Sequence, residues 1–196
     1  MISIFVDNTI RYPASSDFFS PDELFPEYAF GHISGQPNPV YRAVRTCLAQ
    51  AGLDRERFGN GDWNPLSHYI PPGSRVFVLC NFVFHRRSVE SQKEFHAKCT
   101  HGSVLRALLD YVLLAVGNGG RVVFGNAPLQ SCRWKDVLAD TGASAVLDFY
   151  KRERKPVQAC DLRLFISERS LLGNVTRTQL LGDEGKAITV DLAMNS

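Results

Sequence analysis

Polar side chains follow three apolar runs that we predict to be β-strands. Asn81 lies just after the run at 76–79, Asn126 lies just after 121–124, and Asp161 follows 157–160. In a parallel sheet, ligands bind beyond the carboxyl ends of the strands, where loops and helix N-termini converge. The other candidates near these ends are His85, Arg86, Arg87, Thr100, His101, Ser103, Gln130, Ser131, Cys132 and Arg163.

A binding site for a small anionic molecule is the first chemistry that these residues suggest. Guanidinium groups and free helix amides both match phosphate or carboxylate oxygens, so we expect Arg86 to contact the anion beside a helix start at Thr100. Asn81, Asn126, Gln130 and Ser131 would orient the ligand through hydrogen bonds. In the alternative interpretation, the arginines are solvated loop residues and Thr100 is simply a helix cap.

Two residues could take part directly in catalysis. His101 is the candidate for proton transfer, and Cys132, just before a predicted helix, could be a thiolate activated by helix amides. Asp161 could orient a histidine or accept a proton. Each also has a structural alternative: the cysteine packs in the core, and the aspartate ends a strand as a turn or cap residue.

A third possibility is a metal site in the loop between 81 and 99 and the helix start that follows it. His85, His96, Cys99 and His101 give the pattern H-x10-H-x2-C-x-H, whose ligand types suit zinc. The spacing matches no familiar zinc finger, and ordinary loop and cap roles are the alternative. The glycine motifs G-x-G-x-x-G and G-x-x-x-x-G-K-S/T are missing, so the sequence does not support nucleotide binding by the usual glycine loops, and the cofactor is unknown.

Composition restricts the classes of partner. The 196 residues carry a net charge of +2, which favours neither nucleic acid nor an acidic tail. Five widely spaced cysteines predict a reduced, cytoplasmic chain, and Asp110 interrupts the longest apolar stretch, at 108–116, so no membrane span or export signal is expected. The oligomeric state is not predicted.

The order of elements favours an α/β fold with a Rossmann-like, three-layer arrangement and a mostly parallel sheet. We predict strands at 2–6, 76–79, 121–124 and 157–160, with helices from 40 to about 51, 100–116, 134–140 and 144–152. The consecutive apolar residues at 76–79 indicate a strand covered on both faces. Thr100 is the expected N-cap of the second helix, and the segment 81–99 is expected to be a loop.

Two further segments complete a single predicted domain, 1–196. The segment 8–39 is rich in proline and aromatic residues and is interpreted as an ordered wrapping loop, while 162–196, including 187–192, suggests added, partly antiparallel strands. Because no closing helix follows, we expect the chain to be the N-terminal part of a longer fold.

Several stretches resemble the domain-of-unknown-function 362 family, especially its branch found beside bacterial surface-polysaccharide genes. The main ones run from Cys99 to Val112 and from Gly120 to Cys132, and FSPDELFPEY at 19–28 and the later 175–177, 182–183 and 190–192 add to them. The resemblance covers most of the chain and implies an enzyme-like protein in polysaccharide biosynthesis, although it supplies no agreed reaction.

Two departures bear on catalysis. Where the family typically has Lys-Pro-Asn and Gly-Asp-Ala-Pro, this chain has Leu79-Cys80-Asn81 and Gly125-Asn126-Ala127-Pro128. A lysine and an aspartate at neighbouring strand ends would form an acid/base or anion-handling pair, and both are uncharged here. The leading hypothesis is therefore an enzyme-like protein that binds a small anionic or sugar-derived molecule; the alternatives are a non-catalytic, truncated binding remnant and a metal-binding protein.

Overall fold

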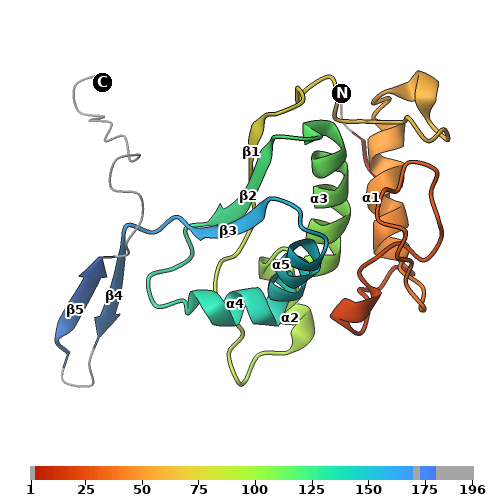
Figure 1. Ribbon diagram of the computed structural model, residues 1–196. Helices are drawn as coiled ribbons and strands as arrows, with labels where there is room; N and C mark the ends of the chain where they lie inside the picture. Colours follow the sequence, from red (N-terminus) through yellow and green to blue (C-terminus); the bar gives the residue numbers. More distant parts are fainter. Residues whose placement is uncertain (1–2, 170–172, 180–196) are drawn as a thin grey trace, which may run out of the picture.

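The computed structural model describes residues 3–169 and 173–179 (Figure 1). Two short 3-10 turns, Ser16–Phe18 and Arg55–Arg57, accompany the regular elements. The helices are α1 (Pro39–Gln50), α2 (Gln92–Lys98), α3 (Gly102–Val116), α4 (Trp134–Thr141) and α5 (Ala143–Arg152). The strands are β1 (Arg75–Leu79), β2 (Arg121–Asn126), β3 (Val157–Asp161), β4 (Phe165–Arg169) and β5 (Val175–Gln179).

The predicted α/β fold class is confirmed. Strands β1, β2 and β3 lie in that order in a parallel sheet, and β4 and β5 form a separate antiparallel pair. Helix α3 packs on β1 and β2, and α5 packs on β3. Helix α1 packs on the side of α3 away from the sheet, so sheet, inner helices and outer helix make three layers (Figure 1).

One face of the sheet carries the core. Val76 and Val78 of β1 pack with Val122 and Phe124 of β2 against α3 and α5. The opposite face is open within the described part of the chain, where Phe77 is 45% exposed and Leu79 is 71% exposed. The expectation that this strand is covered on both faces is therefore wrong. Two successive crossovers run in the same direction along the sheet, and because both have the same hand they place their helices on one face.

The first predicted strand is also wrong as far as the structure describes it. Residues 3–8 join no sheet, and Ile4 and Val6 are exposed. A short β-branched run favours a strand only where a neighbouring strand completes its hydrogen bonds, and β1 and β3 form the edges of the sheet without it. The irregular segment 8–39 that follows buries Phe19 and Phe25, and Asn38 at its end caps α1 by accepting a hydrogen bond from the Tyr41 amide.

Helix boundaries differ from prediction on either side of Thr100. The segment expected to be a loop contains α2, which begins with a capping box between Ser91 and Glu94. Helix α3 begins at Gly102, and its N-cap is His101 rather than Thr100. The β4–β5 hairpin agrees with the predicted antiparallel strands of 162–196, while 187–192 lies outside the described residues.

Helix α3 buries a charged pair in an otherwise apolar face. The Asp110 carboxylate accepts hydrogen bonds from Arg106 Nε at 3.1 Å, the Tyr41 hydroxyl at 3.0 Å and the Tyr150 hydroxyl at 2.6 Å. A buried carboxylate needs such partners to offset its desolvation. Among the described residues, no helix is long and apolar enough to cross a membrane.

Candidate functional site

The loops after the three parallel strands are joined by backbone hydrogen bonds. The Cys80 amide donates to Gly125 O at 2.9 Å, and the Leu129 amide donates to Val83 O at 3.1 Å. The Leu162 amide donates to Asn126 O at 2.9 Å and joins the loop after β3 to the end of β2. The carboxyl ends of β1, β2 and β3 thus form one edge, as the strand order predicts; we call it the carboxyl edge.

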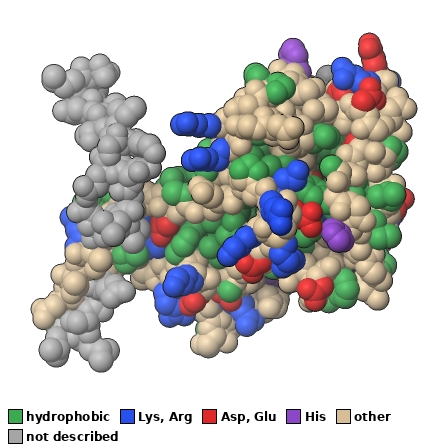
Figure 2. Space-filling model, in the orientation of Figure 1, with side chains coloured by type: hydrophobic (Ala, Val, Ile, Leu, Met, Phe, Trp, Pro, Cys, Tyr) green, Lys and Arg blue, Asp and Glu red, His purple; other side chains and the backbone are tan. Residues whose placement is uncertain are grey.

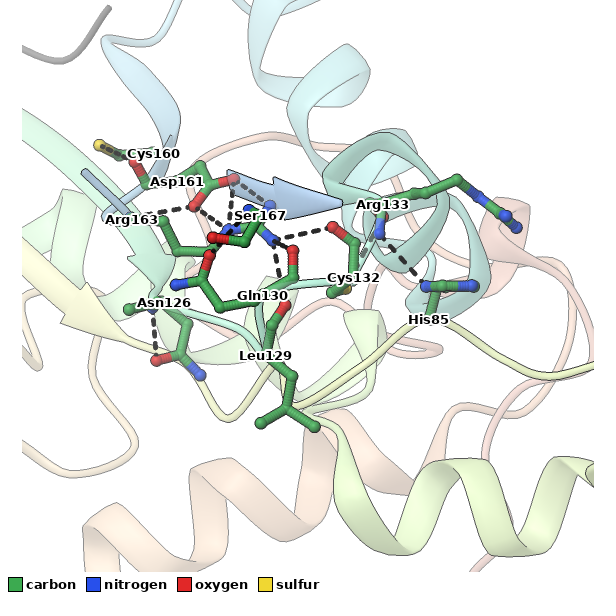
Figure 3. Close-up of polar contacts among 11 residues, drawn as sticks. His85, Asn126, Leu129, Gln130, Cys132, Arg133, Cys160, Asp161, Arg163 and Ser167 are labelled. Atoms are coloured by element: carbon green, nitrogen blue, oxygen red, sulfur yellow. Dashed lines mark hydrogen bonds and ion pairs between the residues drawn. The ribbon is translucent and has the colours of Figure 1, made fainter. Parts of the chain in front are cut away.

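A buried arginine fixes the loop after β2 at this edge. Arg163 Nε lies 3.0 Å from Asp161 Oδ1, and Arg163 Nη2 lies 2.6 Å from Asp161 Oδ2. Arg163 Nη1 donates to the carbonyl oxygens of Leu129, Gln130 and Cys132 at 2.9–3.0 Å (Figure 3). The Arg163 side chain is only 2% exposed. The Asp161 carboxylate therefore holds Arg163, not a histidine, and we call this arrangement the Arg163 clamp.

Two side-chain amides, those of Asn126 and Gln130, lie in the loop that the Arg163 clamp holds. Asn126 Oδ1 accepts a hydrogen bond from the Ala127 amide at 2.8 Å, and its Nδ2 donates to no group in the described chain (Figure 3). Gln130 is exposed, and its Oε1 accepts a hydrogen bond from the Ser167 amide at 3.2 Å. Ser131 is also exposed beside it. Asn126 and Gln130 therefore use their acceptors to fix the loop and leave their amide donors available.

The loop after β1 supplies a third side-chain amide, that of Asn81. The Asn81 backbone amide donates to Thr100 Oγ1 at 2.9 Å, and Asn81 Nδ2 donates to Lys98 O at 3.1 Å. Thr100, which directly precedes the N-cap His101, thus ties this loop to the start of α3 and does not itself cap the helix. Both residues lie at the carboxyl edge, as predicted, but their hydrogen bonds are internal.

Arg86 and Arg87 are exposed cations of this loop. The Arg86 backbone amide donates to Asp140 Oδ2 at 2.7 Å, which holds the loop near the end of α4, while the Arg86 guanidinium has no ion-pair partner among the described residues. Arg87 lies with its guanidinium 5.2 Å from the centre of the Phe84 ring. An unpaired, exposed guanidinium is suited to an incoming anion.

His101 has a structural role as the N-cap of α3. Its Nδ1 accepts a hydrogen bond from the Ser103 amide at 3.2 Å, and its ring stacks on Tyr12 with a centroid separation of 4.0 Å. Burial lowers the pKa of His101 to about 4, with a smaller contribution from His96. A neutral, enclosed ring that caps a helix is poorly placed for proton transfer near neutral pH.

The surroundings of Cys132 disfavour the thiolate form that nucleophilic attack requires. The side chain is buried, and burial raises the pKa of its thiol, so the thiolate expected from the sequence is disfavoured. Helix α4 begins only at Trp134, and the Arg133 amide donates to Nδ1 of His85 at 3.2 Å. The helix start thus meets a buried histidine.

The four predicted metal ligands do not come together. Within the described ranges, no group of three or more histidine, cysteine or acidic side chains could hold a metal ion. His96 and His101 are neighbours, with ring centroids 4.7 Å apart, but His85 faces Arg133 and the Cys99 thiol donates to Phe84 O at 3.5 Å.

Sequence reasoning missed the ion pair between Asp161 and Arg163. Their spacing of two residues after a strand was a usable signal, because it allows both side chains to point to the same side of the chain. The stacking of Tyr12 on His101 had no sequence signal, since the two residues are far apart in the chain.

Comparisons with protein-family models, with curated proteins and with solved structures gave no match to this chain. The resemblance to the domain-of-unknown-function 362 family therefore stays a prediction.

Proposed function

We propose that this chain binds a small anionic, sugar-derived molecule at the carboxyl edge. The observation that carries the proposal is the Arg163 clamp, which fixes the loop of Asn126 and Gln130 through three of its carbonyl groups. A preorganised loop loses little entropy when a ligand binds, so its amide donors are available at low cost.

The anionic character of the ligand rests on Arg86. Its exposed guanidinium lies in the loop after β1, and the neighbouring loop after β2 offers the neutral donors Asn126 Nδ2 and Ser131 Oγ. An exposed arginine together with several neutral donors suits a phosphorylated or carboxylated polyol, whose hydroxyl groups need neutral partners. The sequence resemblance favours a role in surface-polysaccharide biosynthesis, and the five widely spaced cysteines fit a reduced, cytoplasmic setting.

A binding protein without catalysis is the second candidate. It is favoured by the roles of the two nominated catalytic residues: His101 caps α3, and Cys132 is a buried thiol with a raised pKa. An enzyme would need a different acid or base at this edge.

Titration calorimetry with glucose 1-phosphate, and with glucose as the uncharged control, tests the proposal. We expect Arg86→Ala to raise the dissociation constant of glucose 1-phosphate about three- to tenfold, as loss of one charge-assisted hydrogen bond should. Asn126→Asp keeps the acceptor for the Ala127 amide but replaces the donor with a negative charge, so we expect a similar loss.

Arg121→Ala is the matched control, because Arg121 is an exposed arginine at the opposite end of β2. Its affinity should equal that of the wild type. Equal affinity of glucose and glucose 1-phosphate, or wild-type affinity in both site variants, would remove this function from the carboxyl edge.

A further inference from the structure

A cavity lies away from the carboxyl edge, between the end of α3 and the turn that joins α5 to β3. Its volume is about 290 Å³, and the 27–30 segment and Tyr41 of α1 complete its wall. This size suits a molecule of one or two rings. None of the residues assigned to the carboxyl edge lines it.

Aromatic side chains form much of the wall. Tyr28 lies 5.6 Å from Phe30 and 6.0 Å from Tyr41 between ring centroids, and Tyr41 lies 6.3 Å from Tyr111. All three separations fall in the range of favourable ring contacts. A flat aromatic ligand would therefore meet rings already held in place by one another.

The two carboxylates in the wall are already neutralised. Glu27 accepts from Arg45 Nε at 2.7 Å and from the Tyr111 hydroxyl at 2.9 Å, while Asp110 holds Arg106 as described above. Each buried carboxylate thus has its own arginine. The cavity interior consequently offers no unpaired negative charge to attract a cation.

The cations at the rim are not neutralised in the same way. Arg154 and Lys155 line the cavity, both are exposed, and neither forms an ion pair with a described residue. Lys155 Nζ lies 5.6 Å from the centre of the Phe30 ring. Figure 2 shows Lys and Arg side chains gathered over α5 and the turn that follows it. The rim therefore favours an anion.

The backbone of Arg154 provides an independent observation. Its φ of 53° is in the left-handed region, at the position after a helix where glycine is favoured. The hydrogen bonds from Arg154 N to Lys151 O and from Lys155 N to Tyr150 O close α5 around it. An arginine in this conformation bears a strain that glycine would not, and such strain is concentrated at functional sites.

We propose that this cavity binds a small aromatic carboxylate, with its ring against Tyr28 and Phe30 and its carboxylate at Arg154 and Lys155. The aromatic wall selects a flat ring, the rim selects a negative charge, and the strained residue keeps a guanidinium at the entrance. The site is independent of the function proposed for the carboxyl edge.

Calorimetric titration of the full chain with 2-naphthoate, and with 2-naphthamide as its uncharged counterpart, tests this site. For a ligand of this size we expect a dissociation constant of about 1 mM or lower for the carboxylate. Arg154→Gly should weaken 2-naphthoate about fivefold and leave 2-naphthamide unchanged. The same variant should raise Tm by about 2–4 °C, because glycine relieves the left-handed strain.

Lys151→Ala is the control, because Lys151 is an exposed cation of α5 that does not line the cavity. It should bind 2-naphthoate as the wild type does, whereas Lys155→Ala should weaken binding like Arg154→Gly. Absence of saturable binding, equal affinity for the two ligands, or an equal loss in Lys151→Ala would overturn the proposal.

Discussion

Replacing Arg163 tests whether the carboxyl edge is built around a buried ion pair. In Arg163→Ala, the Asp161 carboxylate loses its bidentate partner, and the carbonyl oxygens of Leu129, Gln130 and Cys132 lose their shared donor. Breaking a buried pair by removing one partner costs about 3–5 kcal/mol. Since domains are stable by about 5–15 kcal/mol, Arg163→Ala should lose a large part of the free energy of unfolding.

A double-mutant cycle separates the pair from the carbonyl contacts. Urea unfolding of Arg163→Ala, Asp161→Ala and the double variant should give a coupling energy of about 1–3 kcal/mol. The double variant should still be less stable than the wild type, because the three carbonyl groups remain without Arg163. Arg133→Ala is the matched control: Arg133 pairs with Asp136 at the surface, its side chain is 70% exposed, and its loss should cost less than about 1 kcal/mol.

Thiol labelling reports on the loop itself. Cys132 is buried and its carbonyl is held by Arg163, so the wild-type thiol should react slowly with a thiol reagent. Arg163→Ala should accelerate labelling at Cys132, located by mass spectrometry, under conditions in which the chain remains folded. A loss of stability no larger than that of Arg133→Ala, together with unchanged labelling, would refute the idea that Arg163 fixes this loop.

Two other predictions concern a histidine and the two faces of the sheet. Burial lowers the pKa of His101 to about 4, so as the pH falls the unfolded chain binds a proton at His101 before the folded chain does. The contribution of His101 to the free energy of unfolding is fully present above a pH of about 6.5, and about 3 kcal/mol of it is lost as the pH drops to 4. His101→Asn keeps a capping side chain, so urea unfolding should show a weaker dependence over this range, and an unchanged slope would contradict the assignment. On the sheet, thermal and urea unfolding should show a cost of about 3–5 kcal/mol for Phe124→Ala on the buried face and less than about 0.5 kcal/mol for Leu79→Ala on the open face; equal costs would mean that the open face is covered.

Periodicity and chain punctuation predicted the elements that carry the core. The apolar spacing from Val40, with Gly52 after it, predicted α1, and the strands β1, β2 and β3 were found within one or two residues. These signals are local, because they depend on which side chains face the core within one element. Which loops meet at the carboxyl edge followed from the parallel strand order alone.

The failures arose where long-range contacts decide local structure. The 2–6 run has strand-like residues, but nothing in them shows whether the sheet has a place for another strand. β1 is buried on one face because both crossovers place their helices on the same side of the sheet. The residues of β1 do not encode that side. His101 became the helix cap although Thr100 is the commoner type, because Thr100 instead binds the Asn81 amide.

The position of Cys80 argues against an acid/base pair shared by neighbouring strand ends. Cys80, which directly follows β1, is 3% exposed and packs in the main core cluster. Burial raises the pKa of its thiol to about 12, so Cys80 stays protonated near neutral pH and supplies no base to the carboxyl edge.

The first exposed polar side chain after β1 is therefore that of the next residue, Asn81. Asn81 is exposed at the end of β1, and across the edge Asn126 keeps its amide donor available after binding its own loop. Two neutral amides cannot exchange protons with a substrate near neutral pH, but they can orient one through hydrogen bonds. Because the carboxyl edge carries these two amide side chains, we propose that it binds a ligand and does not carry out acid/base chemistry.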